Sequence, residues 1–441
     1  MEISVKRRNF LTLATGTAAG AALAACGSSG PAGTTPAKAG EAGYWTLSGP
    51  PGESVRQGAV DRFNKANPDG QIKLNLFQND AYKDKLKTAF GAGQQPTVVW
   101  GWGGGGLKSY VDAGQVDDLT DWFAQNAPVK DRLFPSSFGP ATIGGKIYAM
   151  PAETVQPIVL FYNKEVFDNL KVTPPQSWGE IMDLVPKFNA AKIAPFSLGG
   201  QSRWTNMMWL EFLFDRIGGQ SVFGDVFEGK AGAWSNPAAI DALTKMQDLI
   251  KADGFIKGFN SITADSNADQ ALLYRGKAAM MLHGSWSYGI QQAEGGTFVK
   301  DGKLGYINFP GVDGGKGDPN DTVGNAGQYL SISSNATTAQ KDIAKKFFTS
   351  LLDDTEQADW IKTGGVPIIK GADAKLAASP DADFLKFVYG VASNAKVFAQ
   401  SWDQALSPTA AEALLDNIAK LFTQSIAPQQ FADNMNAVIG K

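Results

Sequence analysis

Four tryptophans lie next to polar residues at the ends of predicted helices and strands: Trp102, Trp204, Trp286 and Trp402. An indole ring offers a flat apolar surface, and polar neighbours offer hydrogen-bond donors and acceptors. A pyranose ring suits such a site, because it has two apolar C–H faces and a rim of hydroxyl groups. Core packing explains any single tryptophan equally well, since large aromatic side chains are usually buried. The four together favour stacking on sugar rings.

Polar side chains near these tryptophans could bind the hydroxyl groups of such a ligand. Amide, guanidinium and carboxylate groups supply the donors and acceptors that hydroxyl recognition requires. The candidates are Gln201, Arg203, Asn206, Asn325, Gln328 and Asp403.

The run of glycines around Trp102 formally matches a nucleotide-binding pattern. Residues 101–106 (GWGGGG) fit G-x-G-x-x-G after a strand and before a helix, which keeps a dinucleotide site open as the less favoured reading. A phosphate-binding P-loop is excluded, because Leu107 separates Gly106 from Lys108. We interpret the run as a flexible loop in which backbone N–H groups of Gly103 and Gly104 approach a ligand beside Trp102.

Catalytic and metal chemistry have little support in the sequence. His283 is the only histidine, so a histidine-rich zinc site is excluded and any Ser-His-Asp triad depends on one residue. No G-x-S-x-G motif surrounds a neighbouring serine, and we interpret His283 as the end of a buried strand. Residues 313–321 (DGGKGDPND) carry oxygen ligands but lack the closing Glu of a calcium loop. We predict no catalytic residue, no metal and no cofactor, with an exported glycan hydrolase that uses unidentified carboxylates or His283 as the alternative.

The first 43 residues have the composition of a targeting segment and a tether. Lys6, Arg7 and Arg8 precede an apolar stretch over residues 10–25, which predicts an export signal over residues 1–26. Residues 7–11 (RRNFL) resemble a twin-arginine motif, and residues 23–26 (LAAC) resemble a lipobox with Cys26 as the lipidated residue. Residues 27–43 are rich in Gly, Ser, Ala, Thr and Pro, which predicts a flexible tether.

The rest of the chain has the composition of a globular protein with two domains. Of its 441 residues 43% are hydrophobic, and residues 44–441 are long enough for two packed cores. Forty Lys and Arg residues against 43 Asp and Glu leave a net charge of -3 with both signs dispersed. No basic face is expected, so nucleic acid is not expected as a partner. No window of 18 apolar residues predicts a transmembrane helix.

Strands alternate with helices in the first part of the chain. The hydrophobic pattern predicts strands over 44–49, 72–77 and 97–102 and helices over 53–67, 82–92 and 107–113, which implies a parallel sheet. Ligands bind beyond the carboxyl ends of such strands, and these ends are the loops 48–52, 78–80 and 102–106. Glu53 and Asp80 lie at the ends of the first two loops and complete the binding candidates there.

Later elements predict a second lobe between two crossing segments. Residues 177–189, 204–216 and 236–252 are predicted helices, and 158–162 and 278–282 are predicted buried strands. We place the crossings near residues 151–156 and 328–333. The N-terminal lobe is then 44–154 with 331–390, and the C-terminal lobe is 155–330 with 391–441.

Several local motifs resemble those of the family 1 extracellular solute-binding proteins, the carbohydrate receptors of ABC importers. The motifs are residues 144–151 (GGKIYAMP), 160–164 (LFYNK), 174–178 (PPQSW), 275–280 (RGKAAM) and 284–286 (GSW). The resemblance extends over nearly all of residues 44–441 and implies two α/β lobes with central sheets and crossing hinge segments that close around a ligand. It places Trp286 at the ligand-stacking position and matches Trp102 and Gln156 to other contact positions.

Within that family, three segments look most like receptors for xylobiose and other xylo-oligosaccharides: residues 100–105 (WGWGGG), 199–206 (GGQSRWTN) and 261–265 (SITAD). Receptors for chitobiose, cellobiose and maltodextrin share the scaffold and stay open as alternatives. The resemblance implies a monomeric lipoprotein on the outer face of the cytoplasmic membrane. Its expected partners are an oligosaccharide and the permease and ATPase subunits of an ABC importer.

Overall fold

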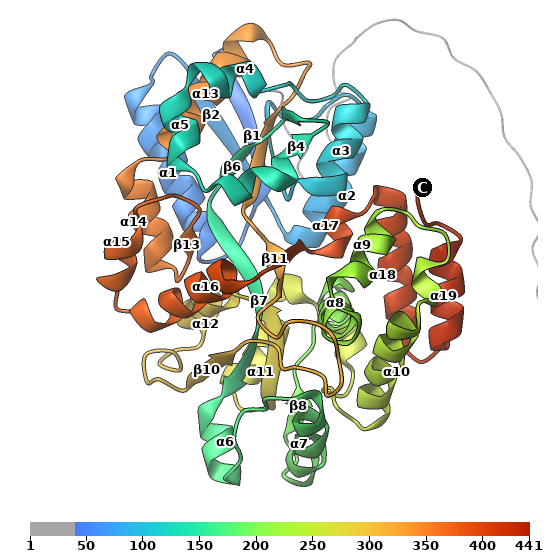
Figure 1. The fold of residues 1–441 in the computed structure, drawn as a ribbon. Coiled ribbons are helices and arrows are strands. Elements are labelled where there is room, and N and C mark those ends of the chain that lie inside the picture. Colours follow the sequence, from blue (N-terminus) through green and yellow to red (C-terminus); the bar gives the residue numbers. More distant parts are fainter. Residues whose placement is uncertain (1–39) are drawn as a thin grey trace, which may run out of the picture. The chain divides into compact units, whose positions relative to one another are not determined.

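The computed structural model describes residues 40–441, and two β-sheets organise this part of the chain into a two-lobed α/β fold (Figure 1). The predicted export signal, Cys26 and most of the predicted tether lie outside the described residues. The first sheet has the order β2-β1-β3-β12-β6. Its strands are β1 (Glu41–Leu47), β2 (Gln71–Phe77), β3 (Val98–Gly101), β6 (Met150–Ala152) and β12 (Gln328–Ile332).

The first sheet is mixed, whereas the alternating pattern predicts a parallel one. β1 pairs in parallel with both β2 and β3, as that pattern implies. β12 runs antiparallel to β3 and to β6. The prediction fails at β12 because this strand returns directly from the other sheet rather than through a crossover helix.

Helices around the first sheet present their apolar side chains to it. In α1 (Gly52–Ala66) the buried residues include Val55, Ala59, Val60 and Phe63, which recur with helical spacing. α13 begins at a capping box in which Thr337 and Gln340 satisfy each other's backbone N–H groups. The other elements of this lobe are α2 (Asn79–Gly91), α3 (Gly104–Asp112), α4 (Thr120–Gln125), α5 (Ala127–Arg132), η1 (Pro135–Ala141), β4 (Thr142–Ile143), β5 (Lys146–Ile147), α13 (Thr338–Ser350), α14 (Asp354–Lys362) and α15 (Asp373–Ala377).

The second sheet has the order β14-β11-β7-β9-β8, and β10 and β13 also pair with β7. Its central strand is the ten-residue β7, which runs down from the first lobe in Figure 1. The strands are β7 (Thr154–Asn163), β8 (Ala194–Phe196), β9 (Ala278–Gly284), β10 (Leu304–Ile307), β11 (Thr322–Asn325), β13 (Val366–Pro367) and β14 (Phe398–Gln400). Every residue of β9 is buried, as expected for a central strand.

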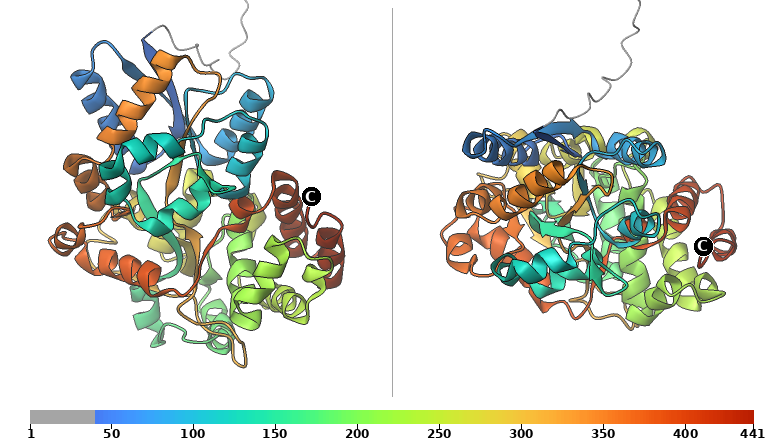
Figure 2. Two further views of the ribbon diagram at one scale, coloured as in Figure 1. Left: turned by 45° about the horizontal axis from the view of Figure 1, so that its top comes forward. Right: turned by 90° about the horizontal axis from the view of Figure 1, so that it is seen from above.

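The helices of the second lobe come from the middle and the end of the chain. Figure 2 shows the C-terminal helices α18 and α19 (red) beside the green helices α8 and α10, which contact them. Asn236 caps α10 as its Ser-Asn-Pro sequence predicts, because its side chain accepts a hydrogen bond from the N–H of Ala238. These helices are α6 (Lys164–Leu170), α7 (Trp178–Ala190), α8 (Trp204–Gly218), α9 (Gln220–Phe227), η2 (Ala233–Ser235), α10 (Pro237–Lys251), η3 (Phe259–Ser261), η4 (Ala264–Ser266), α11 (Ala268–Tyr274), α12 (Ser287–Glu294), α17 (Trp402–Ala405), α18 (Pro408–Phe422) and α19 (Pro428–Asn436). Helix α16 (Ala382–Asn394) contacts both α15 of the first lobe and β7 of the second sheet.

The chain passes between the two sheets at short connections. Glu153 alone separates β6 from β7, inside the first predicted crossing. Residues 326–327 separate β11 from β12, so this passage lies just before the predicted segment 328–333. Among the described residues, no helix is long and apolar enough to cross a bilayer.

A buried ion pair fixes the first of these connections. The guanidinium of Arg56 on α1 donates to both carboxylate oxygens of Glu153, at 2.8 and 2.7 Å. The indole Nε1 of Trp100 donates to the same carboxylate at 2.9 Å. Glu153 has a φ of 62°, a conformation that non-glycine residues rarely adopt, so these bonds hold a strained position.

We expect Arg56→Met to destabilise the protein by about 3–5 kcal/mol, because the substitution leaves the Glu153 carboxylate buried without a cation. Arg132→Met is the matched control, since Arg132 pairs with Asp354 on the surface and should contribute less than about 1 kcal/mol. Chemical denaturation of both variants measures the difference. Equal losses in the two variants would contradict the assignment.

Candidate functional site

A cavity of about 430 Å³ lies beyond the carboxyl ends of the first sheet's parallel strands. On this side it is lined by residues 47–52 after β1, by Gln78 and Asn79 after β2, and by Trp100 and Trp102 on and after β3. Parallel strands end at one edge of a sheet, which explains why three loops far apart in the sequence converge here. Of the three predicted loops the first two line the cavity, and the third contributes Trp102.

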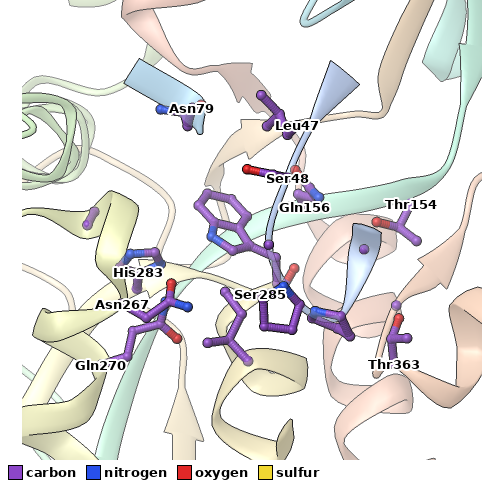
Figure 3. Close-up of a pocket in the computed structure, with 18 of the residues that line it drawn as sticks. Leu47, Ser48, Asn79, Thr154, Gln156, Asn267, Gln270, His283, Ser285 and Thr363 are labelled. Atoms are coloured by element: carbon purple, nitrogen blue, oxygen red, sulfur yellow. The ribbon is translucent and has the colours of Figure 1, made fainter. Parts of the chain in front are cut away.

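The opposite wall belongs to the second lobe. Figure 3 shows Asn267, Gln270 and His283 across the cavity from Leu47, Ser48 and Asn79. This wall also contains Gln156 on β7, Trp204 at the start of α8, residues 264–266, Ser285, Trp286 and Asn325. A third segment, Trp360 with residues 363–365, completes the lining.

Aromatic rings gather at two places on the cavity wall. Trp204, His283 and Trp286 form one cluster, in which the His283 ring lies edge-on to both indoles with centroids 5.3 Å apart. Trp102 lies edge-on to Trp100 at 4.6 Å on the other wall. Trp102, Trp204 and Trp286 are only partly buried, so part of each ring remains accessible.

Gly284 explains the Gly-Ser-Trp spacing in this cluster. A Cβ atom at Gly284 would overlap the six-membered part of the Trp286 indole. The ring therefore lies directly across the backbone at the end of β9, and a side chain at position 284 would displace it.

Several buried polar atoms on the cavity wall have no hydrogen-bond partner within the described chain. They are the acceptors Asp265 Oδ1, Gln270 Oε1 and Asn325 Oδ1, together with His283 Nε2 and the donor Trp204 Nε1. Each unsatisfied group costs about 1–3 kcal/mol in the folded state. Buried polar groups in native proteins are nearly always paired, so these atoms are available to hydrogen-bond a polar ligand or water in the cavity.

The geometry around His283 is that of a structural network. Ser287 Oγ lies 2.6 Å from His283 Nδ1, and Asp269 Oδ2 lies 3.5 Å from His283 Nε2. Ser287 and Asp269 are buried and do not line the cavity, so this serine is not exposed to a ligand there. His283 lies in the buried strand β9, as predicted.

Four other predicted residues hold the site in place without lining the main cavity. Glu53 accepts a hydrogen bond from the N–H of Gly49 at 2.7 Å and so fixes the loop after β1. The N–H of Asp80 donates to Asp265 Oδ2 at 3.0 Å, and Asp403 pairs with Lys83 at 3.0 Å, so both join the two lobes. Asp403 also lines a hollow of about 60 Å³ that shares Trp102, Trp204, Trp286 and Asn325 with the main cavity. Gln328 is fully buried, and its Oε1 accepts a hydrogen bond from the N–H of Thr154.

Three predicted residues lie elsewhere. Trp402 is buried in the core of the second lobe, where it stacks on Phe223 with ring centroids 4.4 Å apart, because aromatic packing there outweighs exposure to the cleft. Arg203 forms ion pairs with Glu412 and Asp416 on α18 and does not line the cavity. Asn206 is buried and donates to the carbonyl of Gly200, which fixes the turn before α8.

Close packing explains the glycine run after Trp102. Gly103 and Gly104 have φ values of 76° and 61°, and a Cβ at Gly103 would lie 2.6 Å from the carbonyl oxygen of Pro140. A Cβ at Gly105 would collide with the carbonyl oxygen of Leu406 in the other lobe. Gly103 and Gly104 therefore do not line the cavity, contrary to the prediction. Gly103 packs on Pro140 of its own lobe, whereas Gly104 and Gly105 allow α3 to approach the second lobe closely.

Other cavity residues had no distinctive pattern in the sequence. Arg56, Asn267, Gln270 and Trp360 lie within helices or at their ends, with ordinary neighbours. Asp265 belongs to residues 261–265, a segment that resembles xylo-oligosaccharide receptors, and this resemblance was the only indication in the sequence that Asp265 could lie in the site. The described residues contain no group of three His, Cys, Asp or Glu side chains placed to hold a metal ion.

The sequence of this chain is similar to those of known proteins. The family model of bacterial extracellular solute-binding proteins matches residues 46–358. The multiple sugar-binding protein of Streptococcus mutans is 26% identical over 289 residues, which cover 60% of this chain and 66% of that protein. The chain spans only 54–66% of the length of the first curated relatives that it matches.

Two solved structures share the fold. A structure from work on xylan utilization by the thermophilic bacterium Caldanaerobius polysaccharolyticus superposes with a TM-score of 0.80 at 30% identity, over 91% of this chain and 100% of that chain. A chitin oligosaccharide binding protein superposes with a TM-score of 0.81 at 24% identity, over 90% of this chain and 97% of that chain.

We expect Gly105→Ala to destabilise the protein by about 1–3 kcal/mol, because the new methyl group meets a backbone carbonyl that cannot move aside easily. Gly106→Ala is the matched control, since no atom lies within 4 Å of a Cβ at that position. Alanine there should stabilise α3 by about 0.5–1 kcal/mol. Denaturant unfolding distinguishes the two, and a stabilising Gly105→Ala would exclude the close contact.

Proposed function

The chain belongs to the family of bacterial extracellular solute-binding proteins, and on that basis we propose that it binds a small oligosaccharide in the cavity between its lobes and delivers it to an ABC importer. In this proposal the protein binds its ligand without chemical change. The alternative of an exported glycan hydrolase lacks an assigned acid, base or nucleophile in the cavity.

The observation that carries this proposal is the combination of surfaces on the cavity wall. Partly exposed indoles of Trp102, Trp204 and Trp286 offer stacking faces for the C–H surfaces of sugar rings. Beside them, buried donors and acceptors without partners are available for hydroxyl groups. A purely apolar ligand would leave these polar atoms unsatisfied, and a ligand without apolar faces would not use the indoles.

We propose xylobiose or another short xylo-oligosaccharide as the ligand. This choice is supported by the likeness to the structure from xylan-utilization work and by the resemblance of residues 100–105, 199–206 and 261–265 to xylo-oligosaccharide receptors. The chitin oligosaccharide binding protein shares the fold, which makes chitobiose the main alternative. Cellobiose and maltodextrin remain further candidates.

The remaining parts of the proposal concern location and movement. Residues 1–26 would direct export, and lipidation of Cys26 would hold the protein at the outer face of the cytoplasmic membrane. The lobes would comprise residues 44–154 with 331–390 and residues 155–330 with 391–441, and would move about the connections at 153 and 326–327. We propose a monomer that presents its ligand to the permease and ATPase subunits.

We expect thermal unfolding to shift with one class of sugar in a panel of xylo-, cello-, chito- and malto-oligosaccharides. A ligand at about 100 times its Kd adds about 2.7 kcal/mol to the free energy of unfolding. Calorimetry or fluorescence measures the shift, and chromatography of the incubated sugar detects any hydrolysis. The absence of a shift with every sugar would contradict the proposed function.

We expect Trp286→Ala to weaken binding of the active sugar by about 2 kcal/mol or more, the scale of a central aromatic contact. Trp122→Ala is the matched control, because Trp122 is also partly buried but packs on Phe123 and Phe348 away from the cavity. Titration calorimetry gives both affinities. An equal effect of the two substitutions would remove Trp286 from the site.

A further inference from the structure

Several carboxylates without an ion-pair partner among residues 40–441 lie on the cavity wall or beside it. Asp265 and Glu294 line it, and Glu53 and Asp80 lie beside it on the first lobe. Among the described residues, none of these four carboxylates forms an ion pair with a Lys, Arg or His side chain. Their recorded partners are neutral: backbone N–H groups for Asp265 and Glu53, and the amides of Asn267 and Asn79 for Glu294 and Asp80.

Arg56 on the cavity wall and Lys83 beside it are both already paired. Arg56 lines the cavity, but its guanidinium is held by both carboxylate oxygens of Glu153 and by the carbonyl of Leu47. Lys83 is paired with Asp403 at 3.0 Å, and its ammonium lies 5.1 Å from the centroid of the Trp102 ring. A negatively charged ligand would therefore have to break an existing ion pair to obtain a counter-charge.

The unsatisfied atoms on the wall also favour a ligand that donates hydrogen bonds. Asp265 Oδ1, Gln270 Oε1 and Asn325 Oδ1 are acceptors and Trp204 Nε1 is a donor, so acceptors predominate among these atoms. Hydroxyl and ammonium groups can donate to these acceptors, whereas a carboxylate or phosphate offers only further acceptor oxygens.

Hydrogen bonds hold Asp265 in a defined position on the cavity wall. Two hydrogen bonds fix its loop. Ser202 Oγ accepts from the N–H of Ala264 at 3.1 Å, and Thr263 Oγ1 accepts from the N–H of Asp265 at 3.2 Å. Its Oδ2 accepts the N–H of Asp80 from the opposite lobe. Burial and the charge of Asp80 raise the pKa of Asp265, and the opposing effects of the Asp80 N–H and the Lys83 charge do not cancel this rise.

We propose that this cavity accepts uncharged or cationic sugars and rejects anionic ones, with Asp265 as the main specificity-determining residue. The inference rests on the proposed sugar-binding function and adds the charge class of the ligand. Two like charges about 6 Å apart near a protein surface repel strongly enough to weaken binding by roughly 100-fold.

The test uses matched derivatives of whichever disaccharide shifts thermal unfolding. Reduction of its reducing end gives a neutral alditol, and oxidation gives the aldonic acid. The terminal sugar is open in both products, so the two differ in charge. Glucosyl-xylose and glucuronosyl-xylose form a second pair, with the charge on the non-reducing ring. Titration calorimetry on the wild-type protein should give at least about 100-fold weaker binding of the acid in each pair whose neutral member binds.

Asp265→Asn identifies the residue responsible. The amide oxygen can still accept the N–H of Asp80, so the contact between the lobes is retained while the charge is lost. The preference for the neutral sugar should fall at least about tenfold. Asp313→Asn removes a charge from the same lobe outside the cavity, and it should leave the preference unchanged.

The outcomes separate this inference from the proposed function. If no sugar of the panel binds the wild-type protein, the proposed function fails and the inference falls with it. If neutral and acidic members bind equally, the inference is overturned while the sugar receptor stands. If the preference persists in Asp265→Asn, the assignment to Asp265 is wrong.

Discussion

The buried ion pair of Arg56 and Glu153 is the constraint on which the arrangement of the site depends. It connects α1 to the single residue that separates the two sheets, and Trp100 on β3 donates to the same carboxylate. Arg56 also donates to the carbonyl of Leu47, after which the first cavity loop begins. Because Glu153 adopts a positive φ, the direction in which β7 leaves the first lobe depends on contacts that hold this conformation. The same ion pair neutralises Arg56, which is the only arginine that lines the cavity among residues 40–441 and which therefore has a structural role.

The two lobes meet through polar contacts and through the close approach of α3 to the backbone of residues 404–406. The beginning of α2 makes two of these contacts: the N–H of Asp80 donates to Asp265, and Lys83 forms an ion pair with Asp403. Gln400 donates to the carbonyl of Trp102, and Gly105 lies against the carbonyl of Leu406. Asp265 and Trp102 make such contacts and also line the cavity, so the position of the lobes and the shape of the cavity are determined together.

The sequence predicts the framework well because the framework follows local rules. Alternating strands and helices locate the loops after β1 and β2, and strand ends at one edge of a sheet must converge. Trp402 and Arg203 show where such reasoning stops, since a tryptophan or arginine at the end of an element can face the core or a neighbouring helix equally well. Gln270 and Trp360 reach the cavity only through tertiary packing, for which short sequence windows hold no signal. The antiparallel β12 was missed for a related reason, because its direction depends on the connection between sheets.

Asp265 links ligand binding to contact between the lobes through one carboxylate. One oxygen accepts a hydrogen bond from the opposite lobe, and the other is buried without a partner. An ionised carboxylate in this position is poorly stabilised until a donor reaches the second oxygen. A ligand hydroxyl that donates to it would therefore lower the free energy of the state in which the lobes are in contact. It would not similarly stabilise a state in which they are apart, because Asp265 would then be hydrated. Selectivity for donor-rich, uncharged ligands and closure around them would thus have the same physical origin.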